Sequence, residues 1–257
     1  MLEIKNISVE AEDKEIVRDV SLSVKEKSLS VLMGPNGSGK SSLVNALFGH
    51  PHYKISKGKI LLGGKDITKL STEEKAQSGL FLSLQHVPRI GGVTLATFLH
   101  KAYTSLHDSD ISVLEFYSNM KDEAEKYGID GTLLDRPLTA GLSGGEKKLS
   151  EILQLIALKP KYAFLDEIDS GVDIDALHKV FGAIDALKKN GTAFVVISHH
   201  PSLLDHFTPE SVHVMSEGKL VRTDGHELAS EIIQKGFCAV AECKHKDTCP
   251  GVCGGEK

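Results

Sequence analysis

A glycine-rich loop in the first fifth of the chain has residue types and spacing that suit phosphate binding. It follows the pattern G-x-x-x-x-G-K-[ST] and reads Gly34, Pro35, Asn36, Gly37, Ser38, Gly39, Lys40, Ser41. Glycines let such a loop curl so that its backbone N–H groups point at phosphate oxygens. We expect Lys40 to supply a cation for the β- and γ-phosphates, and the Ser41 hydroxyl, followed by Ser42, to join a Mg²⁺ shell.

The residues around this loop favour that interpretation over an ordinary glycine-rich turn. The apolar run 29–33 before the loop is typical of a buried strand, and residues 40–48 after it have a helical pattern. A helix that starts at the loop would aim the positive end of its dipole at the same phosphates. The loop is therefore predicted to hold a nucleotide.

Two adjacent carboxylates follow a second apolar run, residues 162–165. We expect Asp166, at the end of that strand, to hold Mg²⁺ through water. Glu167 is one step further and is expected to act as the general base for a water in line with the γ-phosphate. Alone, the pair would be interpreted as a solvated acidic turn; beside the glycine loop, the catalytic interpretation is favoured.

A third glycine motif opens a predicted helix in the middle of the chain. Ser143 has the residue type that caps helices, and Gly144 and Gly145 would let the helix N-terminus approach a phosphate. A plain helix cap is the alternative. Together with the loop and the carboxylates, this motif resembles the signature of ATP-binding-cassette (ABC) ATPases, and the resemblance covers roughly residues 1–235.

The resemblance implies a head-to-tail homodimer that forms with ATP, in which the Ser143 motif of one subunit closes over the ATP held by the other. It implies that Gln85 senses Mg²⁺ and the γ-phosphate, and that a loop ending at Asp173 contacts the opposite subunit. His199 is implied to hydrogen-bond the γ-phosphate, and the adjacent His200 is the competing candidate. The resemblance alone implies ATP as the nucleotide. Residues 9–17 do not select the base, because they offer no aromatic to stack on it and only Val17 for an apolar contact.

Three stretches resemble the SufC-type ATPases of SUF iron–sulfur cluster assembly more than transporter cassettes. Residues 143–148 read SGGEKK, residues 86–94 read HVPRIGGVT, and residues 165–177 read LDEIDSGVDIDAL where transporters more often have DEPTSALD. The resemblance implies a partner scaffold of the SufB or SufD kind. The alternatives are the cassette of a membrane transporter and a metal-binding or redox-sensing module with a regulatory cassette. A DNA-repair cassette is disfavoured because about 75 residues after Gln85 leave no room for its long coiled coil.

All four cysteines lie in the last 20 residues, at Cys238, Cys243, Cys249 and Cys253. Four thiolates with His245 among them could form a tetrahedral zinc site or hold an iron–sulfur cluster. The spacing matches neither zinc pairs nor the usual ferredoxin run, and a reduced tail without metal is the alternative. Because the chain resembles ATPases of iron–sulfur cluster assembly, we favour an iron–sulfur cluster over zinc.

The elements that must position these residues follow from apolar periodicity. Short apolar or alternating runs predict strands over 2–9, 20–24, 29–33, 59–62, 162–165, 193–197, 212–215 and 219–222. Apolar residues three and four apart predict helices over 40–48, 93–106, 111–127, 145–158, 175–189 and 226–235. Strands alternating with helices indicate an α/β fold of the P-loop NTPase type, with a mostly parallel sheet covered on both faces.

Domain organisation follows from where the composition changes. We expect a cassette domain over 1–237, with a helical subdomain inserted at about 88–159, and a cysteine-rich tail over 238–257. The formal net charge of −5 argues against nonspecific nucleic-acid binding. No apolar run approaches the roughly 20 residues that cross a bilayer, and the opening residues MLEIKNISVE do not resemble a secretory signal. We therefore expect a cytoplasmic protein without direct membrane insertion.

Overall fold

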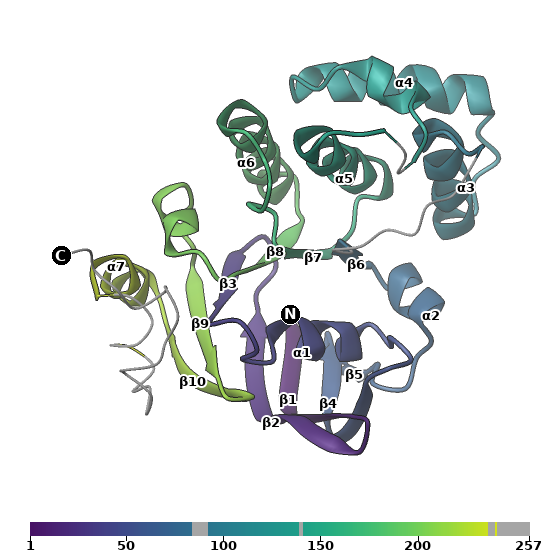
Figure 1. Cartoon of the computed structure of the whole chain (residues 1–257). Helices are drawn as coiled ribbons and strands as arrows, with labels where there is room; N and C mark the ends of the chain where they lie inside the picture. Colours follow the sequence, from purple (N-terminus) through teal and green to yellow (C-terminus); the bar gives the residue numbers. More distant parts are fainter. Residues whose placement is uncertain (84–91, 139–140, 236–239, 241–257) are drawn as a thin grey trace.

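The computed structural model describes residues 1–83, 92–138, 141–235 and 240. Among these residues the strands form two sheets (Figure 1). The first, here called the N-terminal sheet, is antiparallel and has the order β2-β1-β4-β5. Its strands are β1 (Leu2–Ala11), β2 (Lys14–Val24), β4 (Lys54–Leu62) and β5 (Lys65–Asp66).

The second sheet, here called the main sheet, has the order β10-β9-β3-β8-β7-β6. The strands from β9 to β6 run parallel, and only β10 at the edge is antiparallel to its neighbour. The six strands are β3 (Leu29–Met33), β6 (Leu80–Ser83), β7 (Tyr162–Asp166), β8 (Ala193–Ser198), β9 (Ser211–Ser216) and β10 (Lys219–Asp224). The expected mostly parallel sheet is therefore present, with a separate antiparallel sheet beside it.

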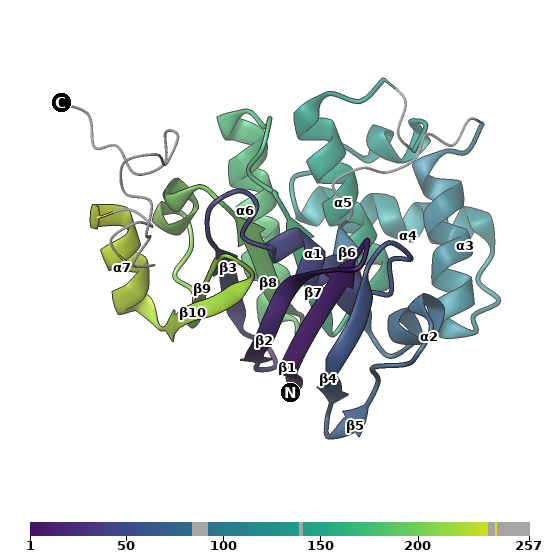
Figure 2. The same ribbon diagram turned by 60° about the horizontal axis from the view of Figure 1, so that its bottom comes forward.

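The α-helices of the described residues lie on either side of the main sheet, as Figure 2 shows from a second direction. They are α1 (Lys40–Leu47), α2 (Thr72–Gln77), α3 (Leu95–His107), α4 (Val113–Lys126), α5 (Gly144–Leu158), α6 (Ile174–Lys189) and α7 (His226–Lys235). Two short 3₁₀ helices are also present: Gly131–Asp135 lies between α4 and α5, and Pro201–Asp205 lies between β8 and β9. None of the described helices is long and apolar enough to cross a membrane.

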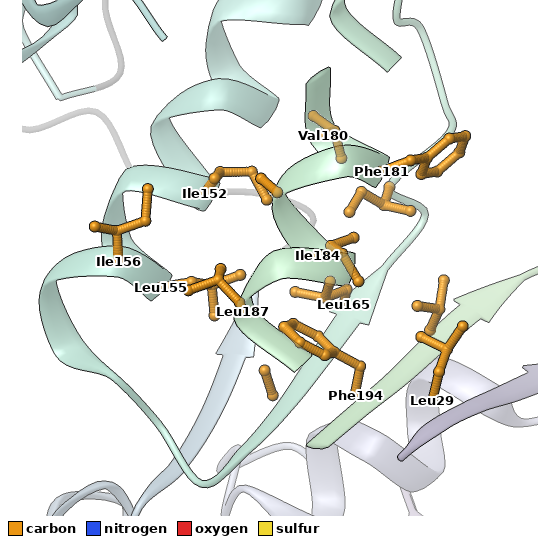
Figure 3. Close-up of a cluster of buried hydrophobic side chains, with 14 of the residues drawn as sticks. Leu29, Ile152, Leu155, Ile156, Leu165, Val180, Phe181, Ile184, Leu187 and Phe194 are labelled. Carbon is orange, nitrogen blue, oxygen red and sulfur yellow. The ribbon is translucent and has the colours of Figure 1, made fainter. Parts of the chain in front are cut away.

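Two hydrophobic cores lie on opposite faces of the main sheet, because successive residues of a strand point to opposite sides. On one face, Leu29, Leu165 and Phe194 pack against α5 and α6 (Figure 3). On the other face, Leu32, Phe164 and Val195 share a core with α1 and the N-terminal sheet. Helices α1 and α5 therefore pack on opposite sides of one sheet (Figure 1).

The sequence predictions missed the short elements α2, β5 and β6 and misjudged some lengths. Helix α2 has only one buried residue, Lys75, so it offers no apolar period to detect. Strand β6 is four residues long, too short for alternation to show. Strand β2 begins at Lys14 rather than at 20, and β4 begins at Lys54 rather than at 59. The turn between β1 and β2 consists of Glu12 and Asp13, both with positive φ (48° and 58°).

Candidate nucleotide-binding site

The glycine loop lies between β3 and α1, as predicted. All residues of β3 are buried, and the chain leaves the strand at Gly34 with φ 147°. A Cβ at Gly34 would lie 2.1 Å from the Met215 carbonyl oxygen on β9, so only glycine fits. Gly39, with φ 97°, is the N-cap of α1 and provides no side-chain cap, and no acidic residue stands in the first turn. The N–H groups at this helix start are therefore suited to an anion.

Lys40 folds back into the loop from which it starts. Its Nζ donates hydrogen bonds to the carbonyl oxygens of Gly34 and Pro35, at 2.8 and 3.0 Å, and lies 3.4 Å from Ser38 Oγ. The residue is 8% exposed, and this burial lowers the pKa of its ammonium. Nearby Asp166 acts against that shift because its negative charge favours the protonated form.

The turn between β9 and β10 holds the glycine loop in place through a backbone hydrogen bond. The Gly218 N–H donates to the Ser38 carbonyl oxygen at 3.0 Å, and its own carbonyl accepts from Arg18 N at 2.8 Å. A Cβ at Gly218 would lie 2.2 Å from the Ile16 carbonyl oxygen, so this contact requires glycine. Sequence reasoning missed Gly218, because a glycine in a hairpin turn signals the turn but not the contact it makes.

Asp166 at the end of β7 is buried, with 6% exposure, and its Oδ1 has no hydrogen-bond partner in the part of the chain that the structure describes. Burial raises the pKa of this carboxyl, and a hydrogen bond with Ser41, at the start of α1, acts in the opposite direction. A buried carboxylate oxygen without a protein partner, next to a hydroxyl, is the set of hard oxygen ligands that Mg²⁺ prefers. The residues present therefore fit the predicted ion.

Glu167 and His199 lie together, although they follow different strands. Glu167 Oε1 lies 3.4 Å from His199 Nδ1, with both side chains about a quarter exposed or less. Glu167 has φ 52°, a conformation that costs energy in a non-glycine residue. Its N–H donates to the Ile197 carbonyl oxygen at 3.0 Å, which ties it to β8. The His200 ring lies against the His199 ring, with centroids 3.8 Å apart and planes tilted by 42°. The 3.4 Å contact with Glu167 favours His199 as the histidine that acts beside the predicted base.

The Ser143 motif caps α5 with its own side chains. Ser143 Oγ accepts from Glu146 N at 3.2 Å, and Glu146 Oε2 accepts from Ser143 N at 2.7 Å, which is a capping box. A Cβ at Gly144 would lie 2.0 Å from the Gly171 carbonyl oxygen, so α5 starts directly against the loop before α6.

Asp173, which was predicted to contact a second subunit, caps α6 in this chain. Its Oδ1 accepts from Ala176 N at 2.9 Å. A Cβ at Gly145 would lie 3.0 Å from Asp173 Oδ2 and 2.9 Å from Ala176 Cβ. The starts of α5 and α6 are therefore packed as one unit, and glycine at 145 makes that possible.

A buried ion pair within α5 is hydrogen-bonded to the end of β6. Lys148 Nζ lies 3.0 Å from Glu151 Oε1, with 11% of each side chain exposed, and Ser83 Oγ donates to Glu151 Oε2. Burial raises the pKa of Glu151, while Lys148 and the Ser83 hydrogen bond act against the shift. Sequence analysis found no role for Glu151 or Ser83, which are far apart in the chain and meet only through the fold.

One predicted residue does not make the contact expected of it, and several others lie outside the described residues. Val17 is fully buried and packs against Gly39, so the expected apolar contact of its side chain with a base is wrong for this arrangement. Gln85 and the tail cysteines 238, 243, 249 and 253 lie outside the described residues. Within the described part of the chain, no cluster of three or more His, Cys, Asp or Glu side chains is arranged to hold a metal.

A glycine loop that runs from a parallel strand into α1, with Lys40 inside it and Asp166 on a nearby strand end, defines a P-loop nucleoside triphosphatase. Residues 17–170 match the family model described as ABC transporter. The chain belongs to this family and is an ATP-binding-cassette ATPase.

Curated relatives and solved structures are similar over nearly the whole chain. Vegetative protein 296 of Bacillus subtilis (strain 168) is 43% identical over 238 residues, covering 92% of this chain and 91% of that protein. Probable ATP-dependent transporter ycf16 of Cyanophora paradoxa is 39% identical over 241 residues, covering 92% and 93%. A nucleotide-free ATP-binding cassette from an ABC transporter is 25% identical with a TM-score of 0.77, covering 91% and 94%.

Proposed function

We propose that two copies of this chain bind two ATP molecules between them and hydrolyse ATP with Mg²⁺. On this proposal the Lys40 loop of one copy and the Ser143 end of α5 from the other grip the same triphosphate. The observation that carries the proposal is that α1 and α5 pack in separate cores on opposite faces of the main sheet. The two glycine motifs would then serve different nucleotides within one chain, so each nucleotide needs a second copy.

The roles of the remaining site residues follow from their positions. Residues 34–42 would hold the phosphates through backbone N–H groups, with the Lys40 ammonium among them. Asp166 and Ser41, with Gln85, would hold Mg²⁺, which neutralises charge that develops on the phosphates. Glu167 would take the proton of the attacking water, and His199, 3.4 Å from it, would hydrogen-bond the γ-phosphate.

The Glu167→Gln variant tests the assigned base. We expect hydrolysis to fall by roughly 10²- to 10⁴-fold, because an amide cannot accept the proton. ATP should still bind, and should trap the dimer that sedimentation detects, whereas the wild-type chain without nucleotide should sediment as a monomer. Glu73→Gln, at an exposed position of α2, is the matched control and should hydrolyse ATP normally. Unchanged turnover in Glu167→Gln would exclude Glu167 as the base.

We further propose that this pairing acts on a scaffold of the SufB or SufD kind in iron–sulfur cluster assembly, in the cytoplasm. Support comes from residues 143–148 and 165–177, where the sequence departs from the transporter form. One of these departures, Lys148, forms the buried ion pair with Glu151, and another, Asp169, bonds to Ser198 beside the site. ATP-driven approach of two cassettes would change the distance between two scaffold subunits attached to them.

A second candidate is the cassette of a membrane transporter. The observation that favours it is the name of several relatives: a Probable ABC transporter ATP-binding protein of Streptococcus pyogenes is 40% identical over 244 residues, covering 94% of this chain. Isolation of the tagged chain from its native host in mild detergent separates the two functions. A partner that binds iron–sulfur clusters supports the first, and an integral membrane partner supports the second.

The domain limits and the cysteine tail give a further test. We propose that residues 1–237, including the inserted segment 88–159, are sufficient for ATP hydrolysis, so a chain ending at 237 should keep its turnover. The four tail cysteines are proposed to bind an iron–sulfur cluster or zinc. Anaerobic purification followed by absorbance and metal analysis should detect iron or zinc in the full chain and none after truncation; a metal-free full chain would remove this proposal.

A further inference from the structure

Asp169 is an acidic residue in the loop after β7 to which the proposed mechanism gives no role. It follows Glu167 by two positions, and it stands where the transporter form DEPTSALD has threonine. Its Oδ2 accepts a hydrogen bond from Ser198 Oγ at 2.9 Å. Its Oδ1 is buried and has no hydrogen-bond partner among the described residues. A carboxylate held this way is costly to bury, so its bond to Ser198 is expected to be strong.

Ser198 connects Asp169 to the backbone of the turn after β8. It is the last residue of β8, is 1% exposed, and uses its hydroxyl hydrogen on Asp169. The same Oγ accepts the backbone N–H of His200 at 3.0 Å. The hydroxyl therefore connects the Asp169 carboxylate to the first peptide groups beyond the strand.

His199 lies between the two backbone points that this chain of hydrogen bonds fixes. Its N-terminal neighbour is held in β8, and its C-terminal neighbour is held through its N–H. The His199 ring contacts Glu167 Oε1 at 3.4 Å and lies against the ring of His200. The loop after β7 therefore contacts the end of β8 and the following turn through two side chains: Glu167 meets the His199 ring, and Asp169 accepts from the Ser198 hydroxyl.

We propose that Asp169 is a positioning residue that acts through the Ser198 hydroxyl to hold the turn carrying His199, so that the imidazole faces the γ-phosphate. The inference rests on the proposed function, because it assumes that His199 acts in hydrolysis. The hydrogen bonds through Ser198 only hold the backbone in place. No proton or electron moves along them, and Asp169 stays an acceptor throughout.

The first test compares steady-state ATP turnover in four variants. Asp169→Ala and Ser198→Ala should each lower kcat about tenfold, the loss that about 1.4 kcal/mol of lost transition-state stabilisation causes. The KM for ATP should change less than about twofold, since the phosphate loop is intact. Ser198→Thr keeps a hydroxyl and should restore most of kcat. Asp185→Ala, at an exposed position on α6, is the matched control and should behave as wild type.

Double variants show whether the effect passes through His199. Asp169→Ala should cost nothing more in a His199→Ala background, and Asp169→Ala with Ser198→Ala should be no slower than either alone, because the three residues act in one path. A full additional tenfold loss in the His199→Ala background would overturn the inference. If Asp169→Ala does not fold, Ser198→Ala paired with Ser198→Thr gives the same comparison.

An NMR measurement on the nucleotide-free protein separates this inference from the proposed function. The Cε1–H signal of His199, assigned by its loss in His199→Ala, should shift in Asp169→Ala and Ser198→Ala but not in Asp185→Ala. An unmoved signal overturns the positioning role. If the signal shifts but His199→Ala hydrolyses ATP normally, positioning is supported and the role of His199 in the proposed function fails.

Discussion

Helices α1 and α5 both begin at glycine motifs, yet their N-termini are completed in different ways. Gly39 offers α1 no side-chain cap. Ser143 and Glu146 cap α5 reciprocally, so two of its orphan donors already have partners. The start of α1 is therefore an anion site within its own chain, and a bound phosphate would complete its hydrogen bonding.

The start of α5 is completed by packing instead. Gly144 and Gly145 let it lie directly against the Gly171 carbonyl oxygen and Asp173, so α5 and α6 start as one rigid unit. Such a unit needs no ligand to be stable, which suits a surface that is presented to a second chain. The comparison teaches that similar glycine motifs can leave a helix start uncapped, as at α1, or let it be capped and packed within its own chain, as at α5.

The largest expected effect comes from removing the Lys40 ammonium at the start of α1. In Lys40→Ala we expect kcat/KM for ATP to fall roughly 10²- to 10³-fold, because the cation aimed at developing phosphate charge is lost. Lys57→Ala removes an exposed lysine of β4 and is the matched control. A steady-state phosphate-release assay measures both variants. A Lys40→Ala enzyme within tenfold of wild type would contradict the assigned role.

The next effect tests the packing of α5. Gly144→Ala should lower the free energy of unfolding by about 2 kcal/mol, because its Cβ meets the Gly171 carbonyl oxygen and the two helix starts must separate. Gly182→Ala is the contrasting variant: Gly182 lies inside α6 with open space around it, and alanine should stabilise by about 0.5–1 kcal/mol. Urea unfolding followed by circular dichroism measures both. Equal stability of the two variants would show that α5 does not depend on this contact.

The third prediction concerns the free-energy cost of burying the Asp166 carboxylate when no nucleotide or Mg²⁺ is bound. Burial raises the pKa of Asp166 above its usual 3.8. Between the ordinary pKa and the raised one, the folded protein therefore binds more protons than the unfolded chain. The contribution of Asp166 to stability therefore decreases as pH rises through that window and is unfavourable at neutral pH. Asp166→Asn should stabilise the nucleotide-free protein by about 1–2 kcal/mol at pH 7.

Unfolding at several pH values, without nucleotide or Mg²⁺, checks this expectation. The advantage of Asp166→Asn over wild type should shrink as the pH is lowered, because protonation removes the charge from the wild-type residue. Asp185→Asn, on the exposed face of α6, should show neither effect. A variant less stable than wild type at neutral pH would mean that Lys40 and Ser41 compensate the buried charge.

The smallest expected effect separates capping from function. Ser143 and Ser112 cap α5 and α4 with the same 3.2 Å bond to the backbone N–H three residues on. Alanine at either position should cost about 0.5–1 kcal/mol of stability. Only Ser143→Ala should also slow ATP turnover and weaken the ATP-bound dimer. Equal turnover in both variants would leave Ser143 as a helix cap alone.

How well the sequence predicted each region depended on how local its cause is. The strand–loop–helix over 29–48 could be predicted because β3 is a buried apolar run and the φ values of Gly34, Gly37 and Gly39 require glycine. The Ser143 cap could be predicted because its partner is three residues away. In contrast, α2 could not, since its only buried residue is Lys75 and no apolar face exists to give a period.

The sequence by itself determined the phosphate loop, the two carboxylates at the end of β7, and the family to which they belong. Each depends on residues close together in the chain, whose backbone conformation and side-chain chemistry are set locally. Only the tertiary structure decided that Glu167 meets His199, that Gly218 fixes the loop at Ser38, and that Asp169 reaches Ser198. Those contacts join segments that are distant in sequence, so they depend on strand order and on which face of the main sheet each helix covers.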